Sequence, residues 1–232
     1  MLQCCKCGKQ YEFVPYESDL TLPVIVCPYC GLRHTVTFEA VDDSSLIVPT
    51  ELKLATWPPV LIASRILNAS RVAQAVDDTD VTGWKKANEF IVVFQLDEEK
   101  GPWTAAYKLQ WKVAGGTYAD LAATGAIKWG TVTDLVNGNA VVIGEKACDA
   151  TGGAGSTWQD GWEVEGASTS SSIVLADEYY TEIWFACNSG DAENGAQYYF
   201  QIYDATNSAV IAEAVATLTT AEITSSLFFL YG

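Results

Sequence analysis

The sequence contains very little histidine, and its C-terminal part contains no basic residue. His34 is the single histidine, and residues 147–232 carry twelve Asp or Glu but no Lys or Arg. This imbalance contributes to a formal net charge of −16 over 232 residues. An acidic surface repels the phosphate backbone of nucleic acids. The composition therefore argues against DNA or RNA as a partner and favours a basic protein surface.

Long apolar runs are also missing. No stretch reaches the roughly 18 apolar residues that a membrane-spanning helix needs, and the longest runs, residues 22–26 and 58–63, have the length of buried strands. The start of the chain lacks the basic residues and the apolar stretch of a secretory signal. We therefore expect a protein that is made in a reducing cytoplasm and has no membrane partner.

Common enzyme and nucleotide-binding motifs are absent. The sequence has no GxGxxG, GxxxxGK[ST], HExxH or GxSxG, and with one histidine it has no His-based triad in the main body. The glycine-rich stretch 152–156 has no basic residue after it, so we interpret it as a loop. Acidic residues are too abundant for any pair to indicate a glycosidase. We predict a protein that is not an enzyme, without catalytic or organic cofactor-binding residues.

Two loops carry clustered carboxylates. They are Asp77-Asp78-x-Asp80 and the stretch 191–195. Neither has the spacing of an EF-hand loop. We interpret both as solvated turns, with calcium binding as the alternative.

The chain does have two matching cysteine motifs, CCKCG at residues 4–8 and CPYCG at residues 27–31. Together they form C-x2-C-x19-C-x2-C, a spacing typical of tetrahedral zinc sites with four cysteine ligands. The glycine after each motif supplies the positive φ that such a turn needs. Iron of the rubredoxin type is the alternative metal. The predicted ligands of one structural zinc ion are Cys4, Cys7, Cys27 and Cys30.

The third cysteine of the first motif is predicted to be a bystander. Alignment of the two motifs places Cys5 opposite Pro28, inside the turn. A shifted pair of Cys5 and Cys7 is the alternative, but a single intervening residue does not make the same turn. His34 lies four residues after Cys30; we interpret it as a strand residue beside the site, and replacement of one sulfur ligand is the alternative.

Polar and apolar residues alternate after each motif, at residues 10–14 and 34–39, as they do in strands. With its cysteines, the segment from residue 1 to 42 resembles the zinc-ribbon family. So small a segment buries too little apolar surface to fold alone. Metal binding, worth roughly 10–16 kcal/mol in comparable peptides, is expected to supply its stability.

A linker is predicted between the ribbon and the rest of the chain. Residues 43–60 mix turn residues with prolines, and Pro58-Pro59 after Trp57 is incompatible with a helix or a central strand. The expected domains are a zinc ribbon over residues 1–42, this linker, and a β domain over residues 61–232.

The β domain is predicted from short apolar segments separated by Gly, Asp, Asn and Ser turns. No alternation of strands with helices occurs, so the pattern favours a mainly β fold, an antiparallel β-sandwich. Jelly-roll and immunoglobulin-like topologies both fit it. The clearest predicted strands are residues 89–96, 105–113, 139–144, 171–175, 179–188, 196–204 and 210–218.

Period-two alternation within these segments predicts which side chains face the core. It assigns Glu182 and its neighbours of even number to the opposite face. Trp111 is a further expected core residue, and Cys148 and Cys187 are expected to be small buried apolar residues. The predicted inward-facing residues are Thr181, Ile183, Phe185, Cys187, Tyr198, Phe200 and Ile202.

Trp158 and Trp162 lie in a glycine-rich, polar segment. If both rings are exposed, they form a platform that stacks on sugars or packs in an interface; if they are buried, they cap the sandwich. The exposed arrangement supports an alternative function, a carbohydrate-binding module.

Two stretches, TEIWFA at residues 181–186 and GAQYYFQI at residues 195–202, resemble the closing strands of a β-sandwich domain that recurs in virion proteins of tailed bacteriophages. Ile202 fills the aliphatic position of that pattern, whereas Gln201 stands where such sequences often carry arginine. The resemblance implies a capsid decoration, cement or accessory shell protein that is made in the host cytoplasm and is oligomeric within an assembly. Its expected partner is a capsid or other virion subunit.

Two further features bear on partners. The apolar C-terminal segment, Leu227 to Gly232, is either the last strand of its own sheet or an arm that docks on a neighbouring subunit. A nucleic-acid-associated zinc ribbon is a third functional hypothesis, but residues 1–60 carry four Lys or Arg against seven Asp or Glu. They contain no basic patch for nucleic acid.

Overall fold

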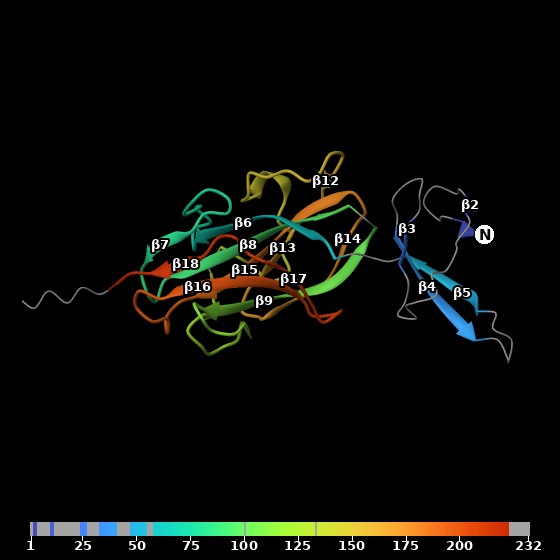
Figure 1. Ribbon diagram of the computed structural model, residues 1–232. Coiled ribbons are helices and arrows are strands. Elements are labelled where there is room, and N and C mark those ends of the chain that lie inside the picture. Colours follow the sequence, from blue (N-terminus) through green and yellow to red (C-terminus); the bar gives the residue numbers. More distant parts are fainter. Residues whose placement is uncertain are drawn as a thin grey trace, which may run out of the picture. The chain divides into compact units, whose positions relative to one another are not determined.

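The computed structural model divides the chain into two compact units, Met1–Trp57 and Pro58–Gly232 (Figure 1). In the second unit the structure describes residues 58–99, 101–132 and 134–222 with their side chains. In the first unit it describes the backbone of five strands.

The strands of the first unit form two small antiparallel sheets. One consists of β1 and β2, and the other has the order β3-β4-β5. Strand β5 lies within the segment 43–60 that the sequence predicts as a linker. The bounds are β1 Leu2–Gln3, β2 Gln10–Tyr11, β3 Val24–Val26, β4 Arg33–Ala40 and β5 Ile47–Leu54.

The second unit is mainly β, as predicted, and its one helical element among the described residues is a short 3-10 turn, η1. No helix in the described part of the chain is long and apolar enough to cross a membrane. Its elements are β6 Val60–Asn68, β7 Val81–Trp84, β8 Glu89–Glu98, β9 Trp103–Val113, β10 Ala119–Asp120, β11 Lys128–Trp129, η1 Ile143–Glu145, β12 Thr157–Trp158, β13 Trp162–Val164, β14 Thr169–Leu175, β15 Tyr179–Asn188, β16 Gln197–Asp204, β17 Ala209–Glu213 and β18 Leu218–Thr220.

These strands form two sheets. The six-stranded sheet has the order β11-β15-β8-β6, with β12 and β13 also paired to β15. The seven-stranded sheet has the order β10-β9-β16-β18-β7, with β14 paired to β9 and β17 to β16. Three pairings are parallel, those of β12 and β13 with β15 and that of β18 with β7. The sheets are therefore mixed, and the prediction of purely antiparallel sheets is wrong at these pairings.

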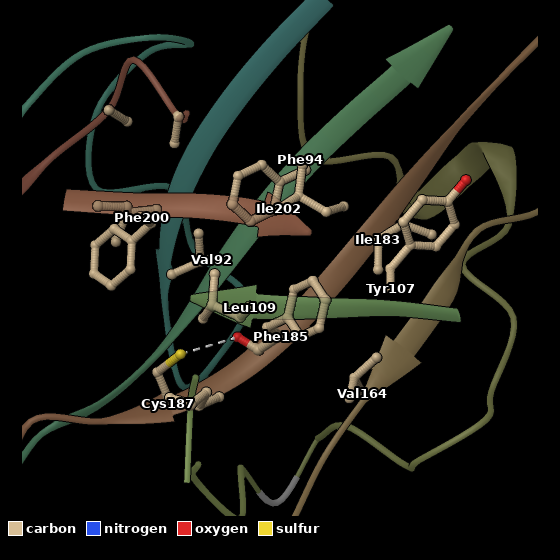
Figure 2. Close-up of a cluster of buried hydrophobic side chains, with 14 of the residues drawn as sticks. Val92, Phe94, Tyr107, Leu109, Val164, Ile183, Phe185, Cys187, Phe200 and Ile202 are labelled. Atoms are coloured by element: carbon tan, nitrogen blue, oxygen red, sulfur yellow. Dashed lines mark hydrogen bonds between the residues drawn. The ribbon is translucent and has the colours of Figure 1, made fainter. Parts of the chain in front are cut away.

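One hydrophobic core joins the two sheets, and Figure 2 shows part of it. Phe94 and Phe185 meet edge to face with ring centroids 6.1 Å apart, and Phe90 packs against Phe200 at 5.9 Å. Trp111 is only half-buried at the margin of this core. The alternation correctly predicted the core positions of Ile183, Phe185, Cys187, Tyr198, Phe200 and Ile202.

The six-stranded sheet is also covered on its other face, referred to below as its outer face. A second cluster there joins Trp184 and Val93 of the sheet to Leu135 and Val141 of the connection between β11 and β12. Glu182 lies on this face and is 0% exposed. The prediction that Glu182 lies on the face opposite the shared core is therefore confirmed, and a distant part of the chain covers that face.

The connection over the outer face also accounts for the one predicted strand that is missing. Residues 139–144 were expected to be extended, but they form loop and the start of η1. Val141 points into the second cluster, whereas Val142 and Ile143 are exposed. The apolar residues of this stretch thus lie on both the buried and the exposed side of a loop, rather than on one face of a strand.

Phe185→Ala should lower the free energy of unfolding by about 3–5 kcal/mol, because it opens a cavity between the two sheets. Urea unfolding followed by tryptophan fluorescence measures the change. Val174→Ala, at a strand position that is 57% exposed, is the control and should cost less than about 1 kcal/mol. Equal losses in the two variants would contradict the assignment of Phe185 to the shared core.

Candidate functional site

The predicted metal ligands lie outside the described residues, but the strands around them are described. β1 pairs with β2, and β3 pairs with β4, both antiparallel. The strand ends leave residues 4–9 and residues 27–32 as the two connections. These connections have equal length, and in each the first and fourth residues are cysteine and the fifth is glycine. The predicted ligands concerned are Cys4, Cys7, Cys27 and Cys30.

This donor set fits zinc. Four thiolates in two matching connections suit a closed tetrahedral site, which is structural rather than catalytic. Cys5 occupies the second position of its connection, where the other has Pro28, so the strand ends give the same alignment as the motifs. His34 lies in β4 and pairs with residues of β3 and β5. Bound zinc would cross-link the two connections and contribute folding energy to the first unit.

In the second unit, the most buried charged group on the outer face is Glu182. Its carboxylate accepts backbone N–H groups from Ala147 at 2.9 Å and Cys148 at 2.8 Å, and the indole N–H of Trp184 at 2.8 Å. Burial raises the pKa of Glu182, while these donors and the charge of Lys146 act in the opposite direction. The carboxylate thus fastens the covering connection to the sheet.

Arg65 makes a second attachment across the outer face. Its guanidinium pairs with Asp77 at 3.0 Å and with Asp149 at 2.8 Å. It also donates hydrogen bonds to the carbonyls of Ala75, at 3.1 Å, and Ala147. Arg65 is only 7% exposed, so these partners compensate a charge that is almost fully withdrawn from water. Three separate segments meet at this one side chain.

A third attachment involves Arg71 and Glu163. The Arg71 guanidinium lies 5.5 Å from the Trp184 ring centroid and pairs with Glu163 at 2.8 Å. It also donates to the carbonyl of Asp134. Glu163, 1% exposed, accepts the backbone N–H of Val136 at 2.8 Å. Both carboxylate oxygens of Glu163 are therefore occupied by groups of the protein itself.

The aspartates at residues 77–80 are also used as attachments. Asp77 accepts N–H groups from residues 149–150 at 2.6 and 3.0 Å. Asp78 accepts hydrogen bonds from an N–H and a hydroxyl of β6 at 2.8 and 2.9 Å. Asp80 accepts hydrogen bonds from the N–H and the hydroxyl of Thr217 at 3.0 and 2.7 Å. Asp78 and Asp80 are exposed, as expected of a solvated turn, but all three carboxylates also bind other segments of the chain. Within the described residues, no group of three or more His, Cys, Asp or Glu is arranged to hold a metal ion.

Trp158 and Trp162 lie on opposite faces of the six-stranded sheet. Trp158 packs on the second cluster, 5.3 Å from the Tyr180 ring centroid, and its indole N–H is 3.3 Å from an Asp160 oxygen. Trp162 pairs with Ile183 and packs on the shared core. Both rings are half-buried. The two tryptophans therefore do not form the common exposed platform that a sugar would need.

The two cysteines of the second unit behave as expected. Cys148 and Cys187 are both buried free thiols. Burial raises the pKa of each thiol well above its ordinary value, so neither is activated as a nucleophile. Their role is packing, Cys187 in the shared core and Cys148 in the second cluster.

The outer face of the seven-stranded sheet carries a group that sequence analysis did not single out. The ammonium groups of Lys108 and Lys112 lie over tyrosine rings. The Lys112 ammonium is 4.3 Å from the ring centroid of Tyr118 and 5.1 Å from that of Tyr199, and the Lys108 ammonium is 4.7 Å from that of Tyr203. Lys108 also pairs with the carboxylate of Asp120 at 2.7 Å, and Lys112 pairs with that of Glu213 at 3.4 Å. Alternation of Lys and Tyr at outward positions of residues 108–112 and 199–203 was the available signal. The group is Lys108, Lys112, Tyr118, Tyr199 and Tyr203.

Comparison with known proteins found no match for the chain among family models, curated proteins or solved structures. In the described part of the second unit, the buried charged side chains at Arg65, Glu163 and Glu182 bind the chain's own segments. They are committed to structure rather than positioned for general acid–base chemistry on a substrate.

We expect one zinc ion per chain by metal analysis of the protein purified without chelator. Cys27→Ser should lose the metal, because it removes a predicted ligand and leaves an open coordination position. Cys5→Ser is the matched control and should retain it, as should His34→Ala. Loss of zinc from Cys5→Ser would contradict the ligand assignment.

Burial raises the pKa of Glu182 above its ordinary 4.5, so the folded state retains a proton that the unfolded state releases. The contribution of Glu182 to the free energy of unfolding is therefore largest below about pH 4.5, and it falls as the pH rises toward the folded-state pKa. Glu182→Gln removes that titration and, by placing an amide against donors, costs about 1–3 kcal/mol. The stability advantage of the wild type over the variant should shrink as the pH rises from 4 to 7.

Urea unfolding at a series of pH values measures this difference. Asp160→Asn, which neutralises an exposed carboxylate, gives the baseline for removal of one charge. A constant difference between wild type and Glu182→Gln across the range would show that Glu182 does not titrate differently in the two states.

Proposed function

We propose that the chain is a non-enzymatic structural protein of a tailed-phage virion, a capsid decoration, cement or accessory shell protein. Its first unit would be a zinc ribbon stabilised by structural zinc, and its second unit a β-sandwich. Its partners would be protein subunits of the particle, and it would be made in the host cytoplasm before assembly.

The observation that supports this proposal most is how the second unit uses its buried charges. Arg65, Glu163 and Glu182 attach the connection between β11 and β12 to the six-stranded sheet, and Arg71 attaches the loop between β6 and β7 to both. The one pocket described is an open, polar depression of about 360 Å³ beside β7. We expect such a molecule to bind a partner through its surface, because the subunits of a shell bind each other by burying surface.

The strands that resemble phage virion proteins occupy central places in the second unit. Residues 181–186 lie in β15, in the interior of the six-stranded sheet, and residues 197–202 lie in β16, in the interior of the seven-stranded sheet. These strands supply Phe185 and Phe200 to the core between the sheets. A likeness confined to interior strands supports a shared sandwich architecture.

For the finer fold, we infer a sandwich in which both sheets contribute to a single core. The parallel pairings of β12, β13 and β18 are additions at the margins of a largely antiparallel arrangement. For the first unit, we infer a zinc ribbon because its cysteines occupy equivalent positions in two connections of equal length.

If the protein is part of a virion, it should stay with particles purified on a density gradient, at a fixed ratio to the main shell protein. Quantitative mass spectrometry of the particle fraction measures that ratio. The free protein run on the same gradient is the control and should remain at the top. Recovery of the protein only in the soluble fraction of infected cells would refute the proposal.

A further inference from the structure

Five exposed aliphatic side chains lie on two loops above the outer face of the six-stranded sheet, and four of them, all except Val76, lie close in sequence to groups that contact Arg71 or to Arg71 itself. One loop joins β6 to β7, and the other is the connection between β11 and β12 (Figure 1). The exposed fractions are 57% for Val72, 55% for Val136, 44% for Val142 and 56% for Ile143. These four residues are named the aliphatic patch.

Arg71 brings the two loops together. From the loop between β6 and β7 it reaches the other loop at two points, pairing with Glu145 at 3.6 Å and donating to the carbonyl of Asp134, and it also pairs with Glu163 of β13 at 2.8 Å. The loops on which the patch residues lie are therefore in direct contact through one side chain.

The patch residues are closely tied to this contact. Val72 directly follows the arginine. Val136 donates its N–H, at 2.8 Å, to the same Glu163 carboxylate that the arginine binds. The carbonyl of Val142 accepts the N–H of Glu145 at 2.8 Å. The patch residues are thus joined to one ion-pair network through their backbone or an adjacent residue.

The fold does not need these side chains for its own core. The same connection already buries Val132, Leu135 and Val141 in the second cluster. Val136 and Val142 directly follow two of these buried residues and face solvent instead. Because exposed aliphatic residues that lie together commonly mark a binding surface, their arrangement calls for a partner.

The charge around the patch defines that partner. Residues 131–165 contain six Asp or Glu and a single Lys. Glu163 is buried, but four of the others, Asp134, Glu145, Asp149 and Asp160, are exposed, and the chain carries a net charge of −16. A second copy would oppose one acidic rim to another, which is unfavourable. A surface with an apolar centre and a rim of Lys and Arg complements the patch in both respects.

We propose that the aliphatic patch is a docking surface for a protein surface with an apolar centre and a basic rim, carried by a shell or tail subunit. This inference rests on the proposed virion function and adds the surface that makes the contact. Arg71, packed against Trp184 and paired with the buried Glu163, fixes the loops before binding. A preformed surface loses little conformational freedom when it docks.

The test uses purified particles from which the protein has been stripped, and measures rebinding of the full chain by co-sedimentation. Val142→Asp/Ile143→Asp should reduce the affinity at least about tenfold, since it places charges in the apolar centre. Val72→Asp tests the other loop and should act in the same direction. Wild-type binding should also weaken as salt rises, because the rim contacts are ionic.

Val174→Asp/Val210→Asp is the matched control. These valines are 57% and 52% exposed and lie on the seven-stranded sheet, in β14 and β17. The control should bind as the wild type does, and near-UV circular dichroism should show that all variants are folded.

The outcomes separate the two proposals. If wild type does not rebind, the virion function fails and this inference fails with it. If wild type and Val142→Asp/Ile143→Asp rebind equally, only the docking surface is wrong. Self-association of the wild type at micromolar concentration that Val142→Asp/Ile143→Asp abolishes would also overturn the proposal, because the occupant would then be a second copy.

Discussion

The rest of the second unit depends on the pairing of β8 with β15. The two strands align over ten residues without a bulge, and both of their faces carry buried apolar side chains. One face meets the seven-stranded sheet in the shared core, and the other carries Ile91, Val93 and Trp184. A sheet that is apolar on both faces needs two covers. The seven-stranded sheet is one cover, and the connection between β11 and β12 is the other.

Covering the outer face with irregular chain has an electrostatic consequence. A loop brings backbone N–H and carbonyl groups into a dry environment, and each one needs a partner. Glu182 and Glu163 accept such N–H groups, and Arg65 and Arg71 donate to such carbonyls. The buried charges are therefore explained by the loop that they hold, which is why their burial does not indicate catalysis.

Sequence periodicity predicted the features of the fold that are determined by residues close together in the sequence. It correctly placed Ile183, Phe185, Phe200 and Ile202 in the core, because alternation in a strand assigns side chains to faces regardless of the partner strand. It could not predict that Glu182 is buried, since its donors Ala147 and Cys148 come from a different segment of the chain. Nothing near Glu182 in the sequence indicates that cover.

The candidate metal ligands illustrate the opposite case. Their identity is a prediction from a local motif, and the strand ends around residues 4–9 and 27–32 repeat the same register. Local spacing is informative there because a metal site is built from short turns whose residues are neighbours in sequence. The parallel pairings of β12 and β13 with β15 have no such local signal, so they were missed.

The connection between β11 and β12 links stability to recognition. Val132, Leu135 and Val141 cover the outer face, while Val136, Val142 and Ile143 in the same connection face solvent. Arg71 serves both sides, because the ion pair with Glu163 anchors the loop and also positions the exposed residues. A substitution that loosens this anchor would therefore affect the surface without touching it. In this unit the proposed binding surface is the solvent-facing side of the connection whose other side covers the six-stranded sheet. The residues that hold this connection in place therefore also determine the shape of the binding surface.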